Sequence, residues 1–180
     1  MGGRGRGWRR RLRRLALVLV VAPPLALTGA LLAYRVVQPP VTTLQLVRLA
    51  QGHGFERALV PAAALGPHLP RAVVAAEDNR FCRHAGVDWA AFAREWRRWR
   101  EGERPRGAST ITMQLTRNLF LWPERSRLRK AVELALAPLV DLILTKERQL
   151  VIYLNQVEFA PGVYGAEAGA RHWYDTRAAA

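Results

Sequence analysis

The feature that most limits what this chain can fold into is a run of twenty uncharged, mostly apolar residues from Leu15 to Tyr34. A helix of about twenty such residues spans the hydrocarbon core of a bilayer. Pro23 and Pro24 interrupt the run, but membrane helices tolerate proline where the freed carbonyls find other partners. The sequence therefore predicts a transmembrane anchor over residues 15–37.

Charge is distributed unevenly around this run. Residues 1–40 hold eight of the arginines and no acidic residue, and all but one of these arginines precede Leu15. Because positively charged flanks stay on the cytoplasmic side, we expect residues 1–14 to be a basic cytoplasmic tail and the rest to lie outside. A cleaved signal peptide is the alternative, with small residues at Thr28-Gly29-Ala30, but the apolar run is long for one.

The remaining chain is long enough for one domain. Residues 38–43 contain a Pro pair that predicts an extended linker, and residues 44–180 show no sustained period-two alternation, so we predict an all-α domain. Asp88, Ser109, Ser126 and Thr145 are expected N-caps, and the apolar residues 72–76 are expected to be buried. The predicted helices cover residues 44–50, 70–78, 89–100, 110–121, 127–144, 146–159 and 165–174.

Two carboxylates, Glu77 and Glu133, are the candidate pair for proton chemistry. Glu77 ends an apolar helix, and Glu133 follows Arg129 by four residues, so the latter two share one helix face. A surface ion pair is the simpler interpretation of that spacing.

Cations accompany these carboxylates. Arg117, Arg129 and Lys130 follow the segment 107–109, which leads into a helix N-terminus where backbone N–H groups and the helix dipole favour an anion. This combination suits a diphosphate, although a basic helical hairpin also fits a nucleic-acid backbone.

The predicted helix 89–100 places Phe92, Trp96 and Trp99 on one stripe with arginines beside it. Such a stripe is either a core-facing surface with a solvated basic face or a face that lies in the membrane interface.

Four motifs, in order, resemble those of glycosyltransferase family 51, the peptidoglycan glycosyltransferases of class A penicillin-binding proteins and stand-alone enzymes. Residues 77–86, EDNRFCRHAG, resemble the pattern E-D-x-x-F-x-x-H-x-G. Residues 107–118, GASTITMQLTRN, resemble G-x-S-T-x-T-Q-Q-x-x-K-N, and residues 129–133 resemble R-K-x-x-E. Residues 145–165 resemble the fourth motif, including Y-L-N. With no room for a transpeptidase domain, the chain is most similar to the monofunctional members.

The resemblance implies a lysozyme-like helical lobe with a small membrane-associated jaw at about residues 89–108, on the periplasmic side of a bacterial inner membrane. It also implies a reaction, in which the 4-hydroxyl of lipid II attacks a lipid-linked glycan. Undecaprenyl diphosphate leaves and a β-1,4 link forms with inversion. The implied partners are lipid II, undecaprenyl-linked glycan, membrane lipids and cell-wall synthesis proteins, but not nucleic acid.

The resemblance also implies roles for single residues. Glu77 would be the general base, and Glu133 would orient cations or help to hold Mg²⁺ or Mn²⁺; no organic cofactor is expected. The diphosphate and sugars would be bound by Ser109, Thr110, Gln114, Arg117, Asn118, Arg129 and Lys130. The supporting motif residues would be Asp78, Phe81, His84, Gly86 and Asn155.

Some positions depart from the family pattern. Arg117 replaces a Lys, and Met113 replaces the first Gln of a Q-Q pair. Family members continue beyond the position of Ala180, so we expect a shortened C-terminus. A lytic muramidase, or an inactive membrane-tethered binding protein, are the alternatives to a glycan polymerase. Neither needs both the three cations and the carboxylate motifs.

Overall fold

The computed structural model describes residues 4–104 and 107–178. The chain divides into two compact units, with the boundary between Val37 and Gln38. The first three residues of the predicted basic tail, residues 105–106 of the predicted jaw and residues 179–180 lie outside the described residues.

The first unit is the helix α1 (Arg4–Tyr34), which includes Pro23 and Pro24. Within the described chain, it is the only helix whose length and composition suit a membrane span, over Arg13–Tyr34 with a mean hydropathy of 2.3. Its apolar side chains are exposed along most of that length, for example Leu19 at 64% and Leu25 at 66%. A hydrocarbon environment would cover this surface, which supports membrane anchoring.

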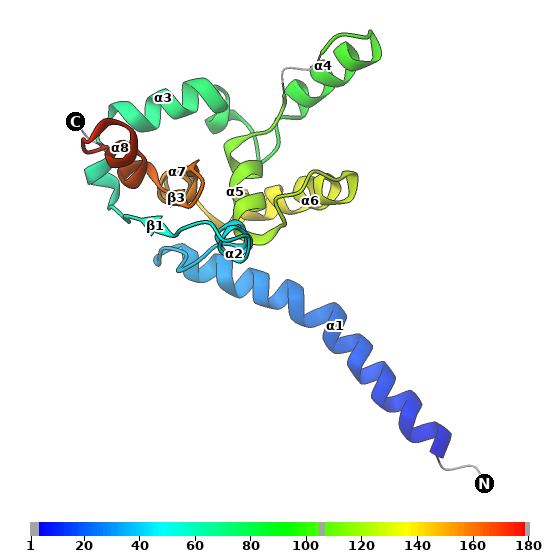
Figure 1. The fold of residues 1–180 in the computed structure, drawn as a ribbon. Coiled ribbons are helices and arrows are strands. Elements are labelled where there is room, and N and C mark those ends of the chain that lie inside the picture. Colours follow the sequence, from blue (N-terminus) through cyan, green and yellow to red (C-terminus); the bar gives the residue numbers. More distant parts are fainter. Residues whose placement is uncertain (1–3, 105–106, 179–180) are drawn as a thin grey trace. The chain divides into compact units, whose positions relative to one another are not determined.

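The second unit, Gln38–Ala180, is mainly helical (Figure 1). Its longer elements are α2 (Thr43–Ala50), α3 (His68–Glu77), α4 (Trp89–Arg100), α5 (Ile111–Phe120), α6 (Arg127–Ile143), α7 (Lys146–Gln156) and α8 (Ala166–Tyr174). Its short elements are η1 (Ala62–Leu65), η2 (Phe81–Arg83), β1 (Glu56–Arg57), β2 (Glu158–Ala160) and β3 (Val163–Tyr164).

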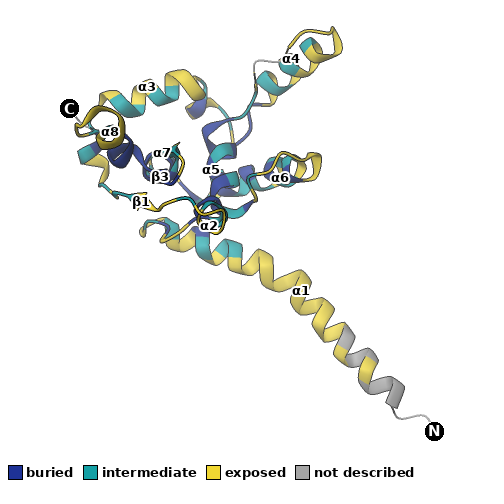
Figure 2. Cartoon of the chain, viewed as in Figure 1, coloured by how far each residue is buried: buried dark blue, intermediate teal, exposed yellow. Residues whose placement is uncertain are grey.

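Helix α5 is the centre of this unit. It packs against α2, α6 and α7, and Figure 2 shows it mostly in the colour of buried residues. Its threonines Thr112 and Thr116 are buried too. Their hydroxyls are hydrogen-bonded, since Thr112 donates to Gln149 Oε1 at 2.6 Å and Thr116 donates to the Thr112 carbonyl at 2.7 Å. Buried hydroxyls that are hydrogen-bonded in this way cost little on folding.

The N-caps follow the sequence with one exception. The side chains of Asp88, Ser126 and Thr145 each accept a hydrogen bond from the first turn of α4, α6 and α7, as predicted. For α5 the prediction of Ser109 is wrong by one residue. The Thr110 hydroxyl accepts from the Met113 N–H at 3.1 Å and donates to a carbonyl of another segment.

The domain also contains a small sheet that the all-α prediction missed. Its order is β1-β3-β2, with β1 parallel and β2 antiparallel to β3. Strands of two or three residues are too short to show alternation in sequence. Helix α7 therefore ends at Gln156, and not near Phe159 as predicted, because the following residues pair with β3.

Helix α3 differs from expectation in its burial and its start. None of its residues is buried, so the prediction that residues 72–76 lie in the core is wrong. Its apolar run consists largely of alanines, whose small side chains bury little area when a helix lies at the edge of a domain. It begins at His68, and Pro70 falls in the first turn, where proline is tolerated.

The segment 38–43, predicted as a linker, belongs to the second unit and packs against the rest of it. Arg57 donates to the carbonyl of Pro39 at 3.3 Å and to that of Pro40 at 2.7 Å. Gln156 also donates to the Pro39 carbonyl, at 3.0 Å. Thr42 is 1% exposed and forms a capping box with Gln45 at the start of α2. The segment is therefore held in one conformation by the domain.

Candidate active site

Glu77 is the last residue of α3, and hydrogen bonds connect its carboxylate directly to α5 and, through α5, to α7. The Gln114 side chain on α5 donates from Nε2 to Glu77 Oε2 at 2.8 Å. The Tyr153 hydroxyl on α7 donates to Gln114 Oε1 at 3.1 Å. Gln114, predicted from sequence to bind substrate, thus contacts the predicted base.

Tyr153 is 5% exposed. Burial, followed by the negative charge of Glu77, raises the pKa of Tyr153 to about 12, while Arg117 acts in the opposite direction. The phenol is therefore a neutral hydroxyl at physiological pH.

Glu77 lines a polar cavity of about 460 Å³. Asp78, Asp88 and Arg94 also line it, together with the segment from Gly107 to Thr110. A cavity of this size and polarity can take a sugar ring beside a carboxylate.

The carboxylate of Asp78, next to Glu77, contacts other groups of the protein. Its Oδ2 accepts a hydrogen bond from the Ile111 N–H at 3.0 Å, and His84 Nε2 lies 3.0 and 3.1 Å from its two oxygens. The positive end of α5 is therefore satisfied by Asp78. The protein thus supplies an anion of its own at the start of this helix, where the sequence predicts a site for an anionic substrate group.

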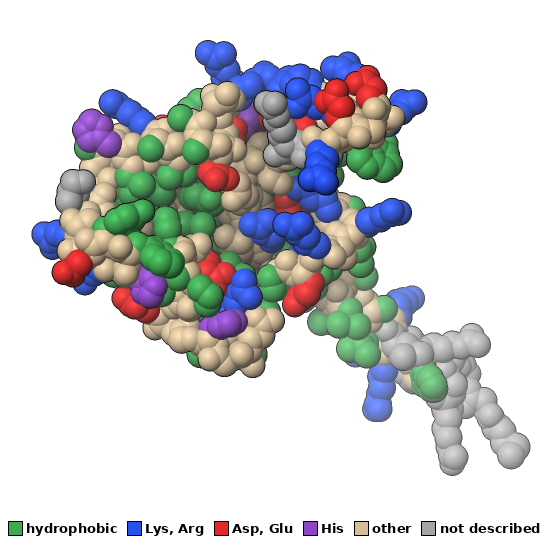
Figure 3. Space-filling view, turned by 45° about the horizontal axis from the view of Figure 1, so that its top comes forward, with side chains coloured by type: hydrophobic (Ala, Val, Ile, Leu, Met, Phe, Trp, Pro, Cys, Tyr) green, Lys and Arg blue, Asp and Glu red, His purple; other side chains and the backbone are tan. Residues whose placement is uncertain are grey.

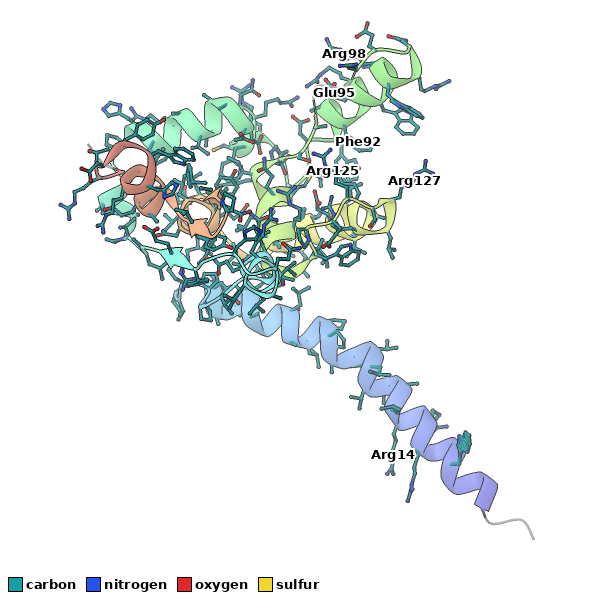
Figure 4. The ribbon with its side chains drawn as sticks, viewed as in Figure 1. Arg14, Phe92, Glu95, Arg98, Arg125 and Arg127 are labelled. Atoms are coloured by element: carbon teal, nitrogen blue, oxygen red, sulfur yellow. The ribbon has the colours of Figure 1, made fainter. Side chains whose placement is uncertain are left out.

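A second cavity, of about 320 Å³, lies against the other predicted cluster. Phe92, Trp96 and Trp99 of α4 form an aromatic side of it, and Lys130 of α6 also lines it. Figure 4 shows Phe92 on the side of α4 that is turned toward α6. Figure 3 shows Lys and Arg side chains along the hollow between these two helices.

The two cavities share Gly107, Ala108 and Ser109. This segment precedes α5 and lines both a polar space that contains Glu77 and a mainly aromatic space that contains Lys130. The sequence predicts the carboxylate of Glu77 and the cation of Lys130, but only the structure shows that their cavities share one segment.

Glu133 is the centre of the cationic cluster. It is 1% exposed, and its two oxygens contact Arg129 Nη1 and Lys130 Nζ, the latter at 2.7 Å. Lys130 Nζ also donates to Ser109 Oγ at 3.0 Å, and Arg129 Nε donates to the Glu124 carbonyl at 3.0 Å. The structure thus brings together Ser109, Arg129, Lys130 and Glu133. The ion pair of Arg129 and Glu133 is buried, whereas the spacing alone favoured an ion pair on the surface.

Arg117 and Asn118 are placed differently. Arg117 Nε donates to Asn118 Oδ1 at 3.3 Å, and within the described residues no hydrogen bond or ion pair joins Arg117 to Glu133. Its charge acts instead on Tyr153. Arg129 and Lys130 are thus joined through Glu133, whereas the hydrogen bond of Arg117 is to its neighbour Asn118.

The residues around Glu133 do not fit a divalent metal. Both carboxylate oxygens are engaged by cations, and a metal ion there would be repelled by the same charges. Within residues 4–104 and 107–178, no group of three or more His, Cys, Asp or Glu side chains could hold a metal ion.

The supporting motif residues have structural contacts. Phe81 is 2% exposed and lies under the Lys146 ammonium, 4.6 Å from the ring centroid. The Gly86 carbonyl accepts from Thr110 at 2.6 Å. Asn155 is fully buried and bonds both the N–H and the carbonyl of Val60.

Thr110, Met113 and Tyr153 have contacts that the sequence does not reveal. Thr110, predicted to bind substrate, is 3% exposed and caps α5. Met113, where the family pattern has Gln, is fully buried with Val87 and Ala137, so this departure lies in the core. The sequence marks Tyr153 only as part of the Y-L-N motif, because helical spacing does not reveal which side chains pack near Glu77.

Comparison with known proteins decides the family. A family model described as "Transglycosylase" matches residues 44–180. The chain belongs to this family. It is 46% identical over 171 residues to the biosynthetic peptidoglycan transglycosylase of Rhodospirillum centenum, covering 94% of this chain and 74% of that one.

Two further relatives carry the same description. The transglycosylase of Caulobacter vibrioides is 38% identical over 175 residues, and that of Rhizobium meliloti is 44% identical over 176 residues. Each alignment covers 97% of this chain, and 76% and 74% of the respective relative. The chain thus spans about three quarters of the length of these relatives. It is a glycosyltransferase of peptidoglycan synthesis, and its apolar α1 is consistent with membrane anchoring.

Proposed function

We propose that this transglycosylase polymerises glycan chains from lipid II. The 4-hydroxyl oxygen of lipid II attacks the anomeric carbon of a lipid-linked growing glycan. The bond from that carbon to the diphosphate oxygen breaks as the new β-1,4 bond forms with inversion. The hydroxyl proton passes to the general base, and undecaprenyl diphosphate leaves with the bonding electron pair.

The observation that supports this reaction best is the pair of cavities that share the segment 107–109. Inversion requires the base and the leaving group on opposite faces of the sugar. Glu77 lines the polar cavity, whereas Lys130 and the aromatic side chains line the other. We therefore place the acceptor sugar beside Glu77 and the lipid diphosphate beside Lys130, with the reacting donor sugar between them, because this arrangement would meet the requirement.

Glu77 is the candidate base. A carboxylate at the edge of an open polar cavity can reach a substrate hydroxyl within hydrogen-bond distance. One of its oxygens already accepts from Gln114, and no hydrogen bond to the other oxygen, Oε1, is present within the described part of the chain. That oxygen is the one that would take the proton.

The leaving diphosphate gains negative charge as the sugar bond breaks, so fixed cations lower the barrier. Lys130 is the best placed, because its side chain is 33% exposed and it lines the cavity. The Arg129 side chain is only 8% exposed and holds Glu133. Its role is therefore to keep Glu133, and through it Lys130, in position.

We further propose that α4 lies in the membrane interface, with residues 1–14 in the cytoplasm and the catalytic unit in the periplasm. None of the residues of α4 is buried, and Trp89, Trp96 and Trp99 are 52–58% exposed. Exposed tryptophans flanked by arginines are typical of interfacial helices, and this exposure favours the interfacial interpretation over the core-facing one. Quenching of single tryptophans by brominated lipids would test it.

A divalent ion, when it takes part, would supply further charge neutralisation on the diphosphate. The phosphate oxygens are suitable ligands for Mg²⁺. Glu133 is not, because its oxygens are engaged by Arg129 and Lys130. We therefore propose that the ion is bound with the substrate.

Polymerisation of purified lipid II by the full chain in detergent tests the function. Glu77→Gln is expected to abolish product, while Glu147→Gln, which changes an exposed carboxylate on α7, is the matched control. Release of reducing ends from preformed glycan, without polymer, would indicate a lytic enzyme. Full activity of Glu77→Gln would rule out Glu77 as the base.

A further inference from the structure

Three helices meet at the hydrogen bonds from Tyr153 through Gln114 to Glu77. The distances are 3.1 Å from the Tyr153 hydroxyl to Gln114 Oε1 and 2.8 Å from Gln114 Nε2 to Glu77 Oε2. Tyr153 itself is buried and does not line the cavity that Glu77 lines. Any effect of Tyr153 on the reaction must therefore pass through Gln114 or through the fold.

The direction of these hydrogen bonds is fixed by their chemistry. An amide oxygen can only accept and an amide nitrogen can only donate. While the Tyr153 hydroxyl donates to Gln114 Oε1, the amide nitrogen of Gln114 must face Glu77. The raised pKa of Tyr153, caused by its burial and by Glu77, keeps the hydroxyl proton in place over the whole working range of pH.

The alternative amide orientation has the opposite effect on Glu77. With the amide reversed, Gln114 Oε1 would face the carboxylate, and this arrangement is favourable only when Glu77 carries a proton to donate. A protonated carboxyl cannot accept the proton of the acceptor hydroxyl. The amide orientation therefore selects between an active and an inactive base.

We infer that Tyr153 is a positioning residue for the general base, which acts through the Gln114 amide to hold Glu77 ionised and correctly oriented. This inference rests on the proposed role of Glu77 in glycan polymerisation. It assigns Gln114 to the base rather than to the substrate, and it assigns a role to a tyrosine that has no direct access to the reacting atoms.

Other charged groups near Glu77 stay unchanged when Tyr153 is altered. They are Arg117 on the same helix as Gln114, Arg94 of α4, and the two acidic residues Asp78 and Asp88 that line the same cavity. Their combined field acts equally on the wild type and on a Tyr153 variant. A difference in the pH dependence of activity between the two proteins is therefore due to the loss of the Tyr153 hydroxyl.

The test compares Tyr153→Phe with Tyr164→Phe in the full chain. Tyr164 is a matched control, because it is fully buried and its hydroxyl has no hydrogen-bond partner within the described residues. For Tyr153→Phe we expect kcat near neutral pH to fall roughly three- to tenfold, the change that loss of one ordinary hydrogen bond produces. KM should change little, the acidic limb of the kcat–pH profile should move to higher pH, and activity should recover toward alkaline pH.

A second background separates positioning from general destabilisation. In Gln114→Leu protein, Tyr153→Phe should cause no further loss, because the connecting amide is absent. An unchanged pH profile in Tyr153→Phe, a loss that is uniform over pH, or an equal loss in the Gln114→Leu background would each overturn the inference.

The wild type and Glu77→Gln are assayed first, so that the two proposals can fail separately. If the wild type polymerises lipid II and Tyr153→Phe behaves like it, only the role of Tyr153 is refuted. A readout without turnover is the NMR titration of the ¹³C-labelled Glu77 carboxyl. Its midpoint should be higher in Tyr153→Phe than in the wild type and unchanged in Tyr164→Phe, and an equal midpoint in all three would refute the inference whatever the activity.

Discussion

The carboxylate of Glu133 lies 2.7 Å from the ammonium of Lys130, one turn away on α6, and is almost completely buried. Its other oxygen contacts Arg129. Glu133 is thus a buried counter-ion for two cations. One of them, Lys130, also donates a hydrogen bond to Ser109 and lines the aromatic cavity. Glu133, one of the two candidate carboxylates, thus has both oxygens engaged by its neighbours on α6.

Lys130→Gln is expected to lower kcat for lipid II polymerisation by about a hundredfold, the typical cost of removing one group that stabilises charge in a transition state. The fold should remain intact, because the side chain is one-third exposed. Lys146→Gln is the matched control, since Lys146 contacts Asp141 and the Phe81 ring instead; it should lower the melting temperature but change kcat by no more than about twofold. Equal kcat in Lys130→Gln and the wild type would argue against the diphosphate role.

Glu133→Ala is expected to destabilise the fold by about 3–5 kcal/mol, because it leaves the buried Arg129 guanidinium without its counter-ion. Glu147→Ala, on the exposed surface of α7, should cost less than about 1 kcal/mol. Thermal unfolding in detergent, followed by circular dichroism, measures both. Similar melting temperatures for the two variants would mean that the cluster contributes little to stability.

Gly86→Ala is expected to be strongly destabilising. Gly86 has φ +80°, and a Cβ there would lie 2.5 Å from the carbonyl oxygen of Ala137 in α6, which is backbone and cannot move aside. Gly102→Ala is the control, with φ +82° but nothing within 4 Å of an added Cβ. It should cost only the left-handed backbone strain of about 1–2 kcal/mol. The difference in melting temperature between the variants isolates the close approach to α6.

Glu167 gives a pH-dependent contribution to stability. The Ala178 N–H, at 3.0 Å, contributes most to lowering the pKa of Glu167; burial acts against it and Arg171 adds to it. Because the pKa is lower in the folded state, the stabilisation is complete above the unfolded value of about 4.3 and is lost as pH falls through the folded pKa. The melting temperature of the wild type should exceed that of Glu167→Gln by a constant amount above about pH 6. That difference should shrink below about pH 4, whereas a pH-independent difference would contradict this origin.

Removal of divalent ions with EDTA is expected to slow polymerisation, and Mg²⁺ should restore it. Because Glu133 is engaged by Arg129 and Lys130, Glu133→Gln should lower the maximum rate without changing the Mg²⁺ concentration for half-maximal rate. A large increase in that concentration would show that Glu133 binds the ion after all.

Local patterns were predictable where the cause is local. Asp88, Ser126 and Thr145 cap the helices that follow them, because an N-cap depends on residues only three positions away. The i, i+4 pair of Arg129 and Glu133 has the same origin. By contrast, the sheet depends on pairing Glu56 with Val163, and no short-range pattern encodes a contact across such a separation.

The sequence by itself determined the apolar span, the helical class and the two candidate carboxylates, since these follow from composition, periodicity and spacing along the chain, and it carried the motifs on which the resemblance to the family rests. Only the tertiary structure decided what each group contacts. It placed Asp78 at the start of α5, Gln114 against Glu77, and Lys130 against Ser109. The physical reason is that hydrogen-bond partners are selected by how helices distant in sequence pack around α5, and that packing is a property of the whole domain.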